Sequence, residues 1–312
     1  MSSPGAQRVS SMETHTGHGA AVMTCTVCDG REFQAEVYGV LSRCQGCGHV
    51  FAPELPAMAP ARLYNEDYFT VAEYVDYAAQ YQTLAKNFNT YLRLMRRYGA
   101  THGRLFEVGA AYGFFLNEAR RSFDVEGIDV SAEATAFGRE RFALPLHCGD
   151  FTAFEPTEPY RVVCLWDTLE HLCQPGEYVA KVHEILGTDG HFFLTTGDIG
   201  SLVPRIQGHR WRLIHPPTHL HYFSWATITR LLHRHGFEGL QITTVGLHRE
   251  LRAMLHGLSL FSRSRVVRTV AGALAERAKA LLGHASVSIN LFDIMFVAAR
   301  KRAGPAHATA SR

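Results

Sequence analysis

The 312-residue sequence has no apolar run long enough to cross a membrane and almost no excess of charge. A transmembrane helix needs about 20 predominantly apolar residues, so no membrane span is predicted. The formal net charge of +2 argues against a nucleic-acid-binding protein. The first residues lack the charged start and apolar core of a secretory signal. We therefore expect a cytoplasmic protein with a disordered leader over residues 1–22 and a disordered tail over 302–312.

Cysteines are few and odd in number, which argues against a disulfide framework in a chain without an export signal. Four of the seven form two Cys-x-x-Cys pairs, Cys25 with Cys28 and Cys44 with Cys47. Four thiolates on two tight turns can close a tetrahedral zinc site that has no open position. Two disulfides or four inert thiols are the alternatives. We predict a structural zinc ion in a ribbon over residues 23–55.

Residues 56–100 follow a Pro/Ala-rich linker and are rich in aromatic side chains. The second half of this segment predicts a helix, because apolar residues recur at spacings of three and four. This stripe consists of Leu84, Phe88, Tyr91, Leu92 and Met95. The segment could close over a ligand as a lid, or it could simply pack the helix onto a sheet.

Strands and helices alternate from residue 101 onward, which predicts an α/β domain with a parallel, Rossmann-like sheet over 101–301. A basic, helical insert is expected within it at 247–290. Ligands of such sheets bind beyond the carboxyl ends of the strands. The loops that matter should therefore follow Val108, Val130, Cys148, Trp166 and Thr195.

A loop rich in small residues follows the first of these strands and contains Glu107, Gly109, Ala111 and Gly113. A dinucleotide fingerprint would need glycine at positions 111 and 114, where Ala111 and Phe114 stand instead. A phosphate-binding P-loop would need a Gly-Lys-Ser/Thr ending, which is absent. Both of these interpretations therefore fail, and an acidic residue followed by small residues at alternate positions remains.

This spacing resembles motif I of the class I S-adenosylmethionine-dependent methyltransferases, E/D-x-G-x-G-x-G, with alanine in place of the middle glycine. The segment LWDTLEHL at 165–172 and the paired cysteines are similar to those of a bacterial subgroup with an N-terminal zinc ribbon. The resemblance implies a seven-stranded methyltransferase sheet and S-adenosylmethionine as the methyl donor. The implied cofactor residues, beyond the small-residue loop with Glu107, are Asp129 at the ribose, Asp150 and Phe151 near the adenine, and Trp166.

Histidines crowd the region after the fifth strand, at His209, His215, His219 and His221. An alcohol acceptor must lose a proton, and histidine is suited to accept it. We predict His171 and His219 as candidate general bases, with Asp167 and Asp198 as further candidates or orienting partners. The alternative is that these histidines only form hydrogen bonds within a packed lid. His219 and His221 could also bind a second metal, but no carboxylate lies at ligand spacing, so none is expected.

The sequence thus predicts a methyltransferase acting on a hydroxyl of a sugar, a glycoside or another small secondary metabolite. Methyl transfer to carbon or nitrogen of a nucleotide sugar or quinone-like acceptor is one alternative. A non-catalytic zinc-ribbon scaffold is another. Residues 249–282 carry a net charge of +5, which suits a solvated helix face, a cap, a dimer face or contact with anionic lipid or a phosphate-bearing acceptor. The oligomeric state is left open.

Overall fold

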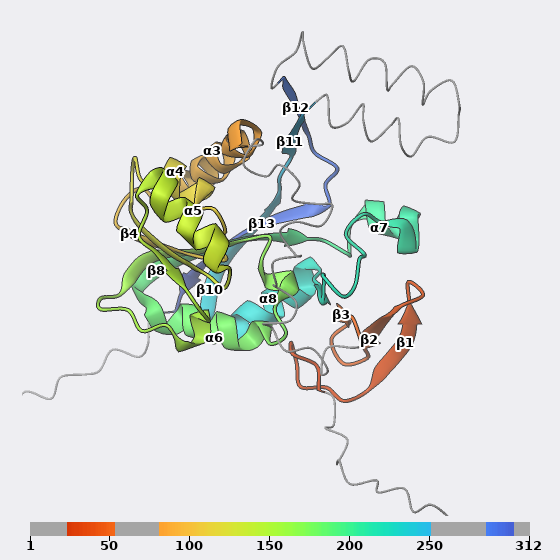
Figure 1. Cartoon of the computed structure of the whole chain (residues 1–312). Coiled ribbons are helices and arrows are strands. Elements are labelled where there is room, and N and C mark those ends of the chain that lie inside the picture. Colours follow the sequence, from red (N-terminus) through yellow and green to blue (C-terminus); the bar gives the residue numbers. More distant parts are fainter. Residues whose placement is uncertain (1–23, 54–80, 251–284, 303–312) are drawn as a thin grey trace, which may run out of the picture.

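A computed structural model describes residues 24–53, 81–250 and 285–302 of the chain (Figure 1). Its centre is a seven-stranded sheet in which β13 (Ile294–Lys301) alone runs antiparallel to the other six strands. The strand order is β10 (Phe237–Thr244), β13, β8 (Leu186–Gly197), β7 (Tyr160–Trp166), β4 (Arg104–Val108), β5 (Asp124–Asp129) and β6 (Leu146–Cys148). The predicted Rossmann-like α/β fold is confirmed.

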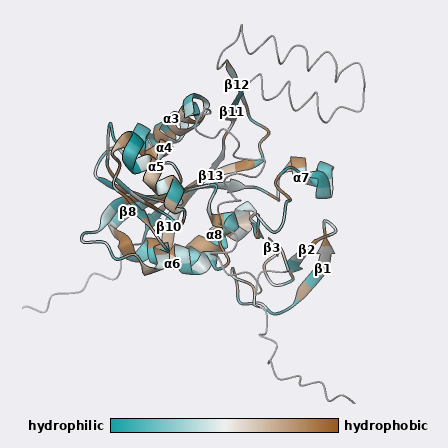
Figure 2. Ribbon diagram, in the orientation of Figure 1, coloured by the Kyte–Doolittle hydropathy of each residue, from teal (hydrophilic) through white to brown (hydrophobic). Residues whose placement is uncertain are grey.

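Helices cover both faces of this sheet, and each buries an apolar side against it (Figure 2). On one face lie α3 (Tyr81–Arg97), α4 (Phe114–Ala119) and α5 (Ala132–Phe142), and on the other lie α6 (Pro175–Ile185) and α8 (Trp225–Arg234). Neighbouring strand residues separate accordingly: Leu105 packs with the first group and Phe106 with the second. This is the two-residue alternation of a strand buried on both faces.

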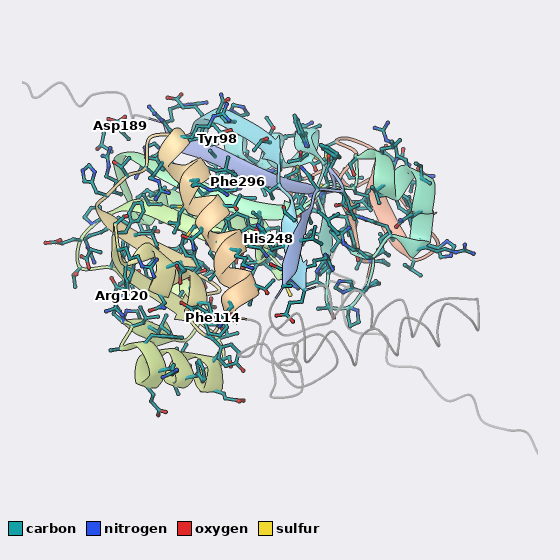
Figure 3. The ribbon with its side chains drawn as sticks, turned by 90° about the horizontal axis from the view of Figure 1, so that it is seen from above. Tyr98, Phe114, Arg120, Asp189, His248 and Phe296 are labelled. Carbon is teal, nitrogen blue, oxygen red and sulfur yellow. The ribbon has the colours of Figure 1, made fainter. Side chains whose placement is uncertain are left out.

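The helix α3 confirms the predicted apolar stripe. Phe88, Tyr91, Leu92 and Met95 are buried against the sheet, and Leu84 is partly buried. In Figure 3, Tyr98 and Phe296 are labelled where the end of this helix crosses β13, and their rings stack 6.3 Å apart. The preceding aromatic segment, predicted to form a lid with α3, lies largely outside the described residues, at 54–80.

The N-terminal ribbon forms a second, four-stranded sheet with one strand taken from the larger domain. Its own strands are β1 (Phe33–Val37), β2 (Leu41–Cys44) and β3 (Val50–Phe51), and β9 (His221–Tyr222) pairs with β3. Cys25, Val27 and Cys44 belong to the same apolar cluster as the buried faces of α6 and α8. The ribbon and the larger domain therefore share a core.

Residues 197–224 contain β9 and a short helix α7 (Leu202–Gln207). The insert predicted to be helical over 247–290 has strands at both ends instead, β11 (Leu247–Glu250) and β12 (Ser286–Ile289), which pair antiparallel. The rest of its basic run lies outside the described residues. Among the described helices, none is long and apolar enough to span a bilayer.

Candidate functional site

A cavity of about 400 Å³ lies at the carboxyl ends of β4, β5, β6 and β7. Its wall includes the loops that follow Val108, Val130, Cys148 and Trp166, four of the five loops predicted to matter. The loop after Thr195 does not contribute to the wall. The inner faces of α3 and α4 supply apolar side chains. A cavity of this size, apolar with a few polar groups, suits a small organic ligand.

The small-residue loop in the cavity wall has left-handed backbone at alternate positions. Gly109 has φ 75°, Ala111 has φ 44° and Gly113 has φ 74°. A Cβ atom at Gly109 would also lie 2.7 Å from Oγ1 of Thr168, so glycine is needed there for space as well. At position 111 only the conformation favours glycine, and alanine adopts it at a cost of about 1–2 kcal/mol. The middle position of the motif therefore favours glycine because of its left-handed backbone, and not only because a ligand approaches it closely.

Asp129 holds this loop in place through hydrogen bonds. Its Oδ2 accepts the N–H of Ala111 at 2.8 Å, and its Oδ1 accepts the N–H of Ser131 at 2.9 Å. Burial raises the pKa of Asp129, and the backbone N–H groups oppose that shift. Each carboxylate oxygen can accept a second hydrogen bond. The residue can therefore fix the loop and still receive a ligand hydroxyl.

Glu107 and Trp166 bring polar atoms to the cavity wall without satisfying them. Oε2 of Glu107 and Nε1 of Trp166 are buried and have no hydrogen-bond partner among the described residues. Burial, followed by the charge of Asp129, raises the pKa of Glu107 well above its ordinary value. Buried polar atoms are nearly always paired in native proteins. The cavity therefore fits a ligand that both accepts and donates hydrogen bonds, as a nucleoside does.

The remaining predicted cofactor residues lie on the same wall and also have structural roles. Asp150 caps a short 3-10 turn through the N–H of Thr152 at 2.9 Å, and its carboxylate is exposed. Phe151 is 2% exposed and packs on Phe106. Trp166 is in ring contact with Tyr91 at 4.8 Å. Their positions are compatible with the predicted cofactor roles, which stay predictions.

The two candidate bases lie against each other beside the cavity. His171 lines the wall and is half-buried, whereas His219 is buried behind it, and their ring centroids are 4.5 Å apart. Nδ1 of His171 bonds to the carbonyl of Thr218, and Nδ1 of His219 bonds to that of Leu213, both at 2.9 Å. Since a carbonyl only accepts, both rings donate from Nδ1, and His171 has a further hydrogen bond with the backbone of Asp167.

Burial lowers the pKa of both rings. The pKa of His171 falls to about 4, opposed by the Thr218 carbonyl. That of His219 falls to about 2, through burial and then through His171 and His215. Both imidazoles are therefore neutral at pH 7, which is the form that can accept a proton.

The two aspartates predicted beside these histidines occupy different places. Asp167 lines the cavity with an exposed side chain and a left-handed backbone, φ 47°. Asp198 is buried, does not line the cavity, and accepts the N–H of Gly200 at 2.8 Å in a turn. The structure brings Asp167, but not Asp198, to the wall that His171 occupies.

The structure places a carboxylate beside His219 that sequence spacing did not indicate. One donor atom each of Glu170, His171 and His219 lie within 4.8 Å of one another. His221, the other half of the His-x-His pair, instead meets His49 of the ribbon, with Nδ1 and Nε2 3.0 Å apart. Glu170 was not predicted as a site residue. It adjoins His171 in the segment 165–172, but its proximity to His219 could not be inferred because the two are distant in sequence.

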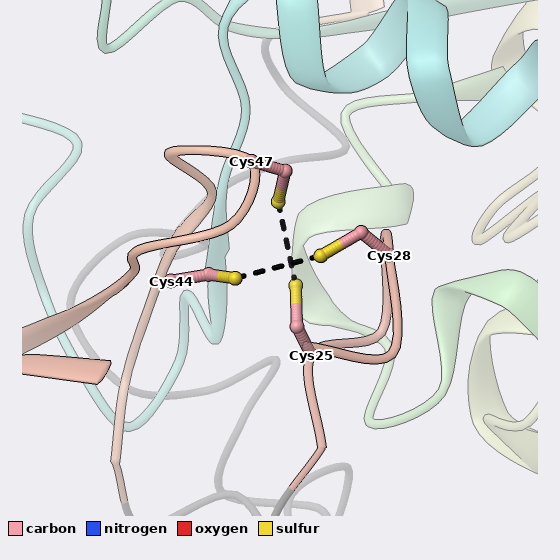
Figure 4. Close-up of side chains that lie close together, drawn as sticks. All are labelled: Cys25, Cys28, Cys44 and Cys47. Atoms are coloured by element: carbon pink, nitrogen blue, oxygen red, sulfur yellow. Dashed lines mark hydrogen bonds between the residues drawn. The ribbon is translucent and has the colours of Figure 1, made fainter. Parts of the chain in front are cut away.

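The four paired cysteines converge in the ribbon (Figure 4). The Sγ atoms of Cys25 and Cys47 are 3.6 Å apart, and those of Cys28 and Cys44 are 3.5 Å apart. Tetrahedral zinc–thiolate bonds of about 2.3 Å would separate sulfurs by about 3.8 Å, whereas a disulfide bond is about 2.0 Å long. A Cβ atom at Gly30 would lie 3.1 Å from the sulfur of Cys44, so the turn leaves room for the sulfurs. The four residues fit a zinc ion.

The sheet order, with β13 antiparallel between β8 and β10, and the cavity beyond β4 and β5 define the S-adenosylmethionine-dependent methyltransferase fold. Residues 77–242, more than half of the chain, match the family model described as "Methyltransferase domain". The chain belongs to this family and is an S-adenosylmethionine-dependent methyltransferase. The scaffold alternative is thereby set aside.

Solved structures with similar folds share little sequence with this chain. A SAM-dependent methyltransferase from Archaeoglobus fulgidus is 16% identical with a TM-score of 0.49, over 73% of this chain and 100% of that one. One from Thermotoga maritima is 13% identical with a TM-score of 0.48, over 73% and 95%. Phosphoethanolamine N-methyltransferase 2 from Haemonchus contortus, solved with S-adenosylmethionine, is 16% identical with a TM-score of 0.45, over 76% and 60%. No curated protein matches the sequence.

Proposed function

We propose that the protein transfers the methyl group of S-adenosylmethionine to a hydroxyl of a small acceptor, a sugar, a glycoside or another secondary metabolite. The observation that carries this proposal is that His171 lines the same cavity as Glu107 and the small-residue loop. A cofactor held at the loop and an acceptor held at the histidine would then share one enclosed space.

Within this proposal the cofactor is held by the loop and by carboxylates. Gly109, Ala111 and Gly113 admit the methionine part close to the backbone, and Asp129 accepts hydrogen bonds from the ribose hydroxyls. Asp150 and Phe151 lie at the adenine. The unsatisfied Oε2 of Glu107 supports a ligand donor at the loop.

When bound, S-adenosylmethionine supplies an electrophilic methyl group on a sulfonium. The chain's own part is to orient the acceptor oxygen, exclude water and receive the hydroxyl proton. We propose His171 for the last role, because its ring is neutral and lines the cavity. His219, buried behind it, would orient the ring and remains the second candidate. Asp167 is the carboxylate placed to pass the proton to solvent.

We further propose that the N-terminal segment is a structural zinc ribbon of the bacterial subgroup that the sequence resembles. The convergence of Cys25, Cys28, Cys44 and Cys47 supports this proposal. The predicted division into a ribbon at 23–55, a lid segment at 56–100 and a methyltransferase domain at 101–301 is kept. The pairing of β9 with β3 adds residues 221–222 to the ribbon's sheet.

The test is methyl transfer from labelled S-adenosylmethionine to separate panels of hydroxyl, amine and carbon-acid acceptors, including glycosides, nucleotide sugars and quinones. Transfer of the label to oxygen supports the proposal if its rate falls at least roughly 100-fold in His171→Ala. The affinity of this variant for the cofactor should stay within a few-fold of the wild-type value. His209→Ala is the matched control, because His209 is an exposed histidine of the same region. Label only on nitrogen or carbon would overturn the hydroxyl assignment in favour of the alternative acceptors.

A further inference from the structure

A second cavity, of about 250 Å³, lies between the strand pair β11–β12 and the start of β13. Five of the described side chains in its wall are apolar, among them Leu247 of β11 and Ile294 of β13. The other three are charged, namely Arg212, Arg249 and Asp293. Charges act strongly on one another in surroundings that are largely apolar.

The carboxylate in this wall is already paired. Asp293 is 1% exposed, and its Oδ1 accepts a hydrogen bond from Nη2 of Arg212 at 3.1 Å. Its Oδ2 accepts one from Nε1 of Trp211 at 2.9 Å and another from Nη1 of Arg212. Burial by itself would raise the pKa of Asp293, but the bonds from Arg212 and Trp211 outweigh it and lower the pKa overall. Asp293 is therefore ionised at pH 7 and neutralises Arg212.

Arg249 is left without a carboxylate partner among the described residues. Although the residue as a whole is exposed, partial burial of its guanidinium lowers its pKa. The charge of Arg212 lowers this pKa further, and Asp293 opposes both effects. A guanidinium stays protonated in proteins, so the wall has one uncompensated positive charge. A charge that has lost part of its water is costly until it is paired.

This cavity adjoins the cofactor cavity. Leu247 belongs to the walls of both, and Arg249 lies on the same face of β11 because side chains alternate along a strand. Arg212 also acts on the first cavity: partial burial raises the pKa of Asp167, and the charge of Arg212 is among the effects that oppose this rise. A ligand that lies across Leu247 would present one end to the cofactor cavity and the other to the arginines.

We propose that Arg249, together with Arg212, binds a carboxylate group of the methyl acceptor. A guanidinium can donate two parallel N–H bonds to a carboxylate, which gives a charged pair of fixed geometry. One uncompensated positive charge is neutralised by a monoanion, whereas a phosphate monoester carries about −1.5 to −2 at pH 7 and would leave an excess of negative charge. The apolar part of the wall suits the carbon skeleton that bears the carboxylate. The acceptor is thus an acidic sugar or another hydroxylated carboxylic acid.

This inference rests on the proposed function, because it concerns the acceptor of the same reaction. The carboxylate takes no part in the methyl transfer itself and only fixes the acceptor with its hydroxyl toward the cofactor cavity. Loss of Arg249 should therefore raise KM for the acceptor and leave kcat within a few-fold, as expected for an interaction that is equal in the ground state and the transition state.

The first experiment measures binding without methyl transfer. The full chain, saturated with S-adenosylhomocysteine, is titrated in a calorimeter with benzoate, benzamide and phenyl phosphate, which share one ring and differ in charge. Wild-type protein should bind benzoate at least about tenfold more tightly than benzamide, and Arg249→Gln should lose this preference. Arg210→Gln is the matched control, because Arg210 is exposed, close to Arg212 in sequence and outside both walls. Arg212 itself is kept, since its removal would leave the buried carboxylate of Asp293 without its cation.

Three results would overturn the proposal. The first is no preference for benzoate in the wild type, or an equal preference in Arg249→Gln and Arg210→Gln. The second is tighter, Arg249-dependent binding of phenyl phosphate, which would assign the cavity to a phosphate group. The third is a fall of at least about tenfold in the affinity of Arg249→Gln for S-adenosylhomocysteine, which would show that Arg249 holds the carboxylate of the cofactor. An unchanged affinity also shows that the variant is folded.

Methyl transfer to paired acceptors separates this inference from the proposed function. A glucuronide and the corresponding glucuronamide share their hydroxyls, and the wild type should prefer the carboxylate member at least about tenfold in kcat/KM. If benzoate binds as expected but no hydroxyl acceptor is methylated, the proposed function fails and the carboxylate site stands. If hydroxyl acceptors are methylated without any preference for a carboxylate, this inference fails and the proposed function stands.

Discussion

The N–H of Leu220 donates a hydrogen bond of 2.9 Å to the carbonyl of Glu170, and the carbonyl of Leu220 in turn accepts the N–H of Ala52 at 2.9 Å. A single residue thus connects the ribbon to the turn that bears Glu170 and His171. His219 is its immediate neighbour. The position of the histidine cluster therefore depends on the ribbon, although none of the ribbon's described residues, 24–53, lines the cavity.

The first prediction concerns the ribbon. Cys44→Ser should abolish zinc binding and, through Leu220, disorder the placement of His219, so methyl transfer should fall by at least about tenfold. Affinity for S-adenosylmethionine should fall much less, because Asp129 and not Leu220 holds the small-residue loop. Zinc content, calorimetry and turnover measure these effects. Cys148→Ser is the control, since Cys148 is exposed and outside the cluster; full turnover in a zinc-free Cys44→Ser protein would disprove the coupling.

The second prediction concerns the left-handed alanine of the loop. Ala111→Gly should raise the free energy of unfolding by about 1 kcal/mol, because relief of the strain exceeds the added entropy of the unfolded chain. Ala143→Gly, at the exposed C-cap of α5 with φ 51°, should stabilise similarly without touching the cavity. Ala110→Gly, which is not at a positive φ, should destabilise. Urea unfolding of the three variants decides, and a less stable Ala111→Gly protein would refute the argument.

The third prediction concerns pH. The folded-state pKa of Glu107 is raised, by burial and then by Asp129, so folded protein holds this proton where unfolded protein has lost it. Its contribution to stability is therefore present below the ordinary glutamate pKa and is lost as pH rises above it, at up to about 1.4 kcal/mol per pH unit. Glu107→Gln should flatten this loss and stabilise the ligand-free protein at pH 7. Urea unfolding between pH 5 and 8 measures it.

Glu126 on the neighbouring strand is the control for this pH effect, with the opposite sign. Burial raises its pKa, but hydrogen bonds from Tyr160 and His147 outweigh burial and lower it overall. Its contribution is present above the ordinary pKa and is lost as pH falls. Glu126→Gln should therefore weaken the protein most at pH 7 and least in acid. The same slope in both variants would contradict the assignment.

The fourth prediction concerns Asp129. In Asp129→Asn the new NH₂ group must face the N–H of either Ala111 or Ser131, so one backbone donor loses its acceptor at a cost of about 1–3 kcal/mol. Because that donor belongs to the cofactor loop or its neighbour, affinity for S-adenosylmethionine should fall at least about tenfold. Asp150→Asn should change little, because asparagine also caps the turn at Thr152. Calorimetry on both variants checks this; equal affinities would remove Asp129 from the site.

The sequence was sufficient to predict the central sheet, because its signals are local. Each parallel strand is a short apolar run bounded by a turn, and the helix α5 begins after Ser131, whose side chain caps it. Strand β8 begins at Leu186, although the segment Gly187 to Gly190 is typical of a turn. Four of the five loops that the carboxyl-end rule indicated then line the cavity.

The rest could not be predicted, because it depends on contacts between distant segments. A strand of two residues such as β9 is too short to show an alternation of apolar and polar residues. Its pairing with β3 therefore could not be predicted from the sequence. Glu170 approaches His219 only because Leu220 binds the backbone of η3 (Leu169–His171). The left-handed conformation of Ala111 was not predicted, because the loop motif was interpreted from the small size of its residues alone. These features become visible only in the folded structure.

The strand that β9 lends to the ribbon also limits how the chain can be divided. A fragment that ends before His221 leaves β3 with an unpaired edge, and a fragment that begins after Phe51 leaves β9 without a partner. His49 and His221 would likewise each lose the other ring. Ribbon and methyltransferase domain should therefore unfold together in one transition, and neither should be transferable to another protein as an independent module.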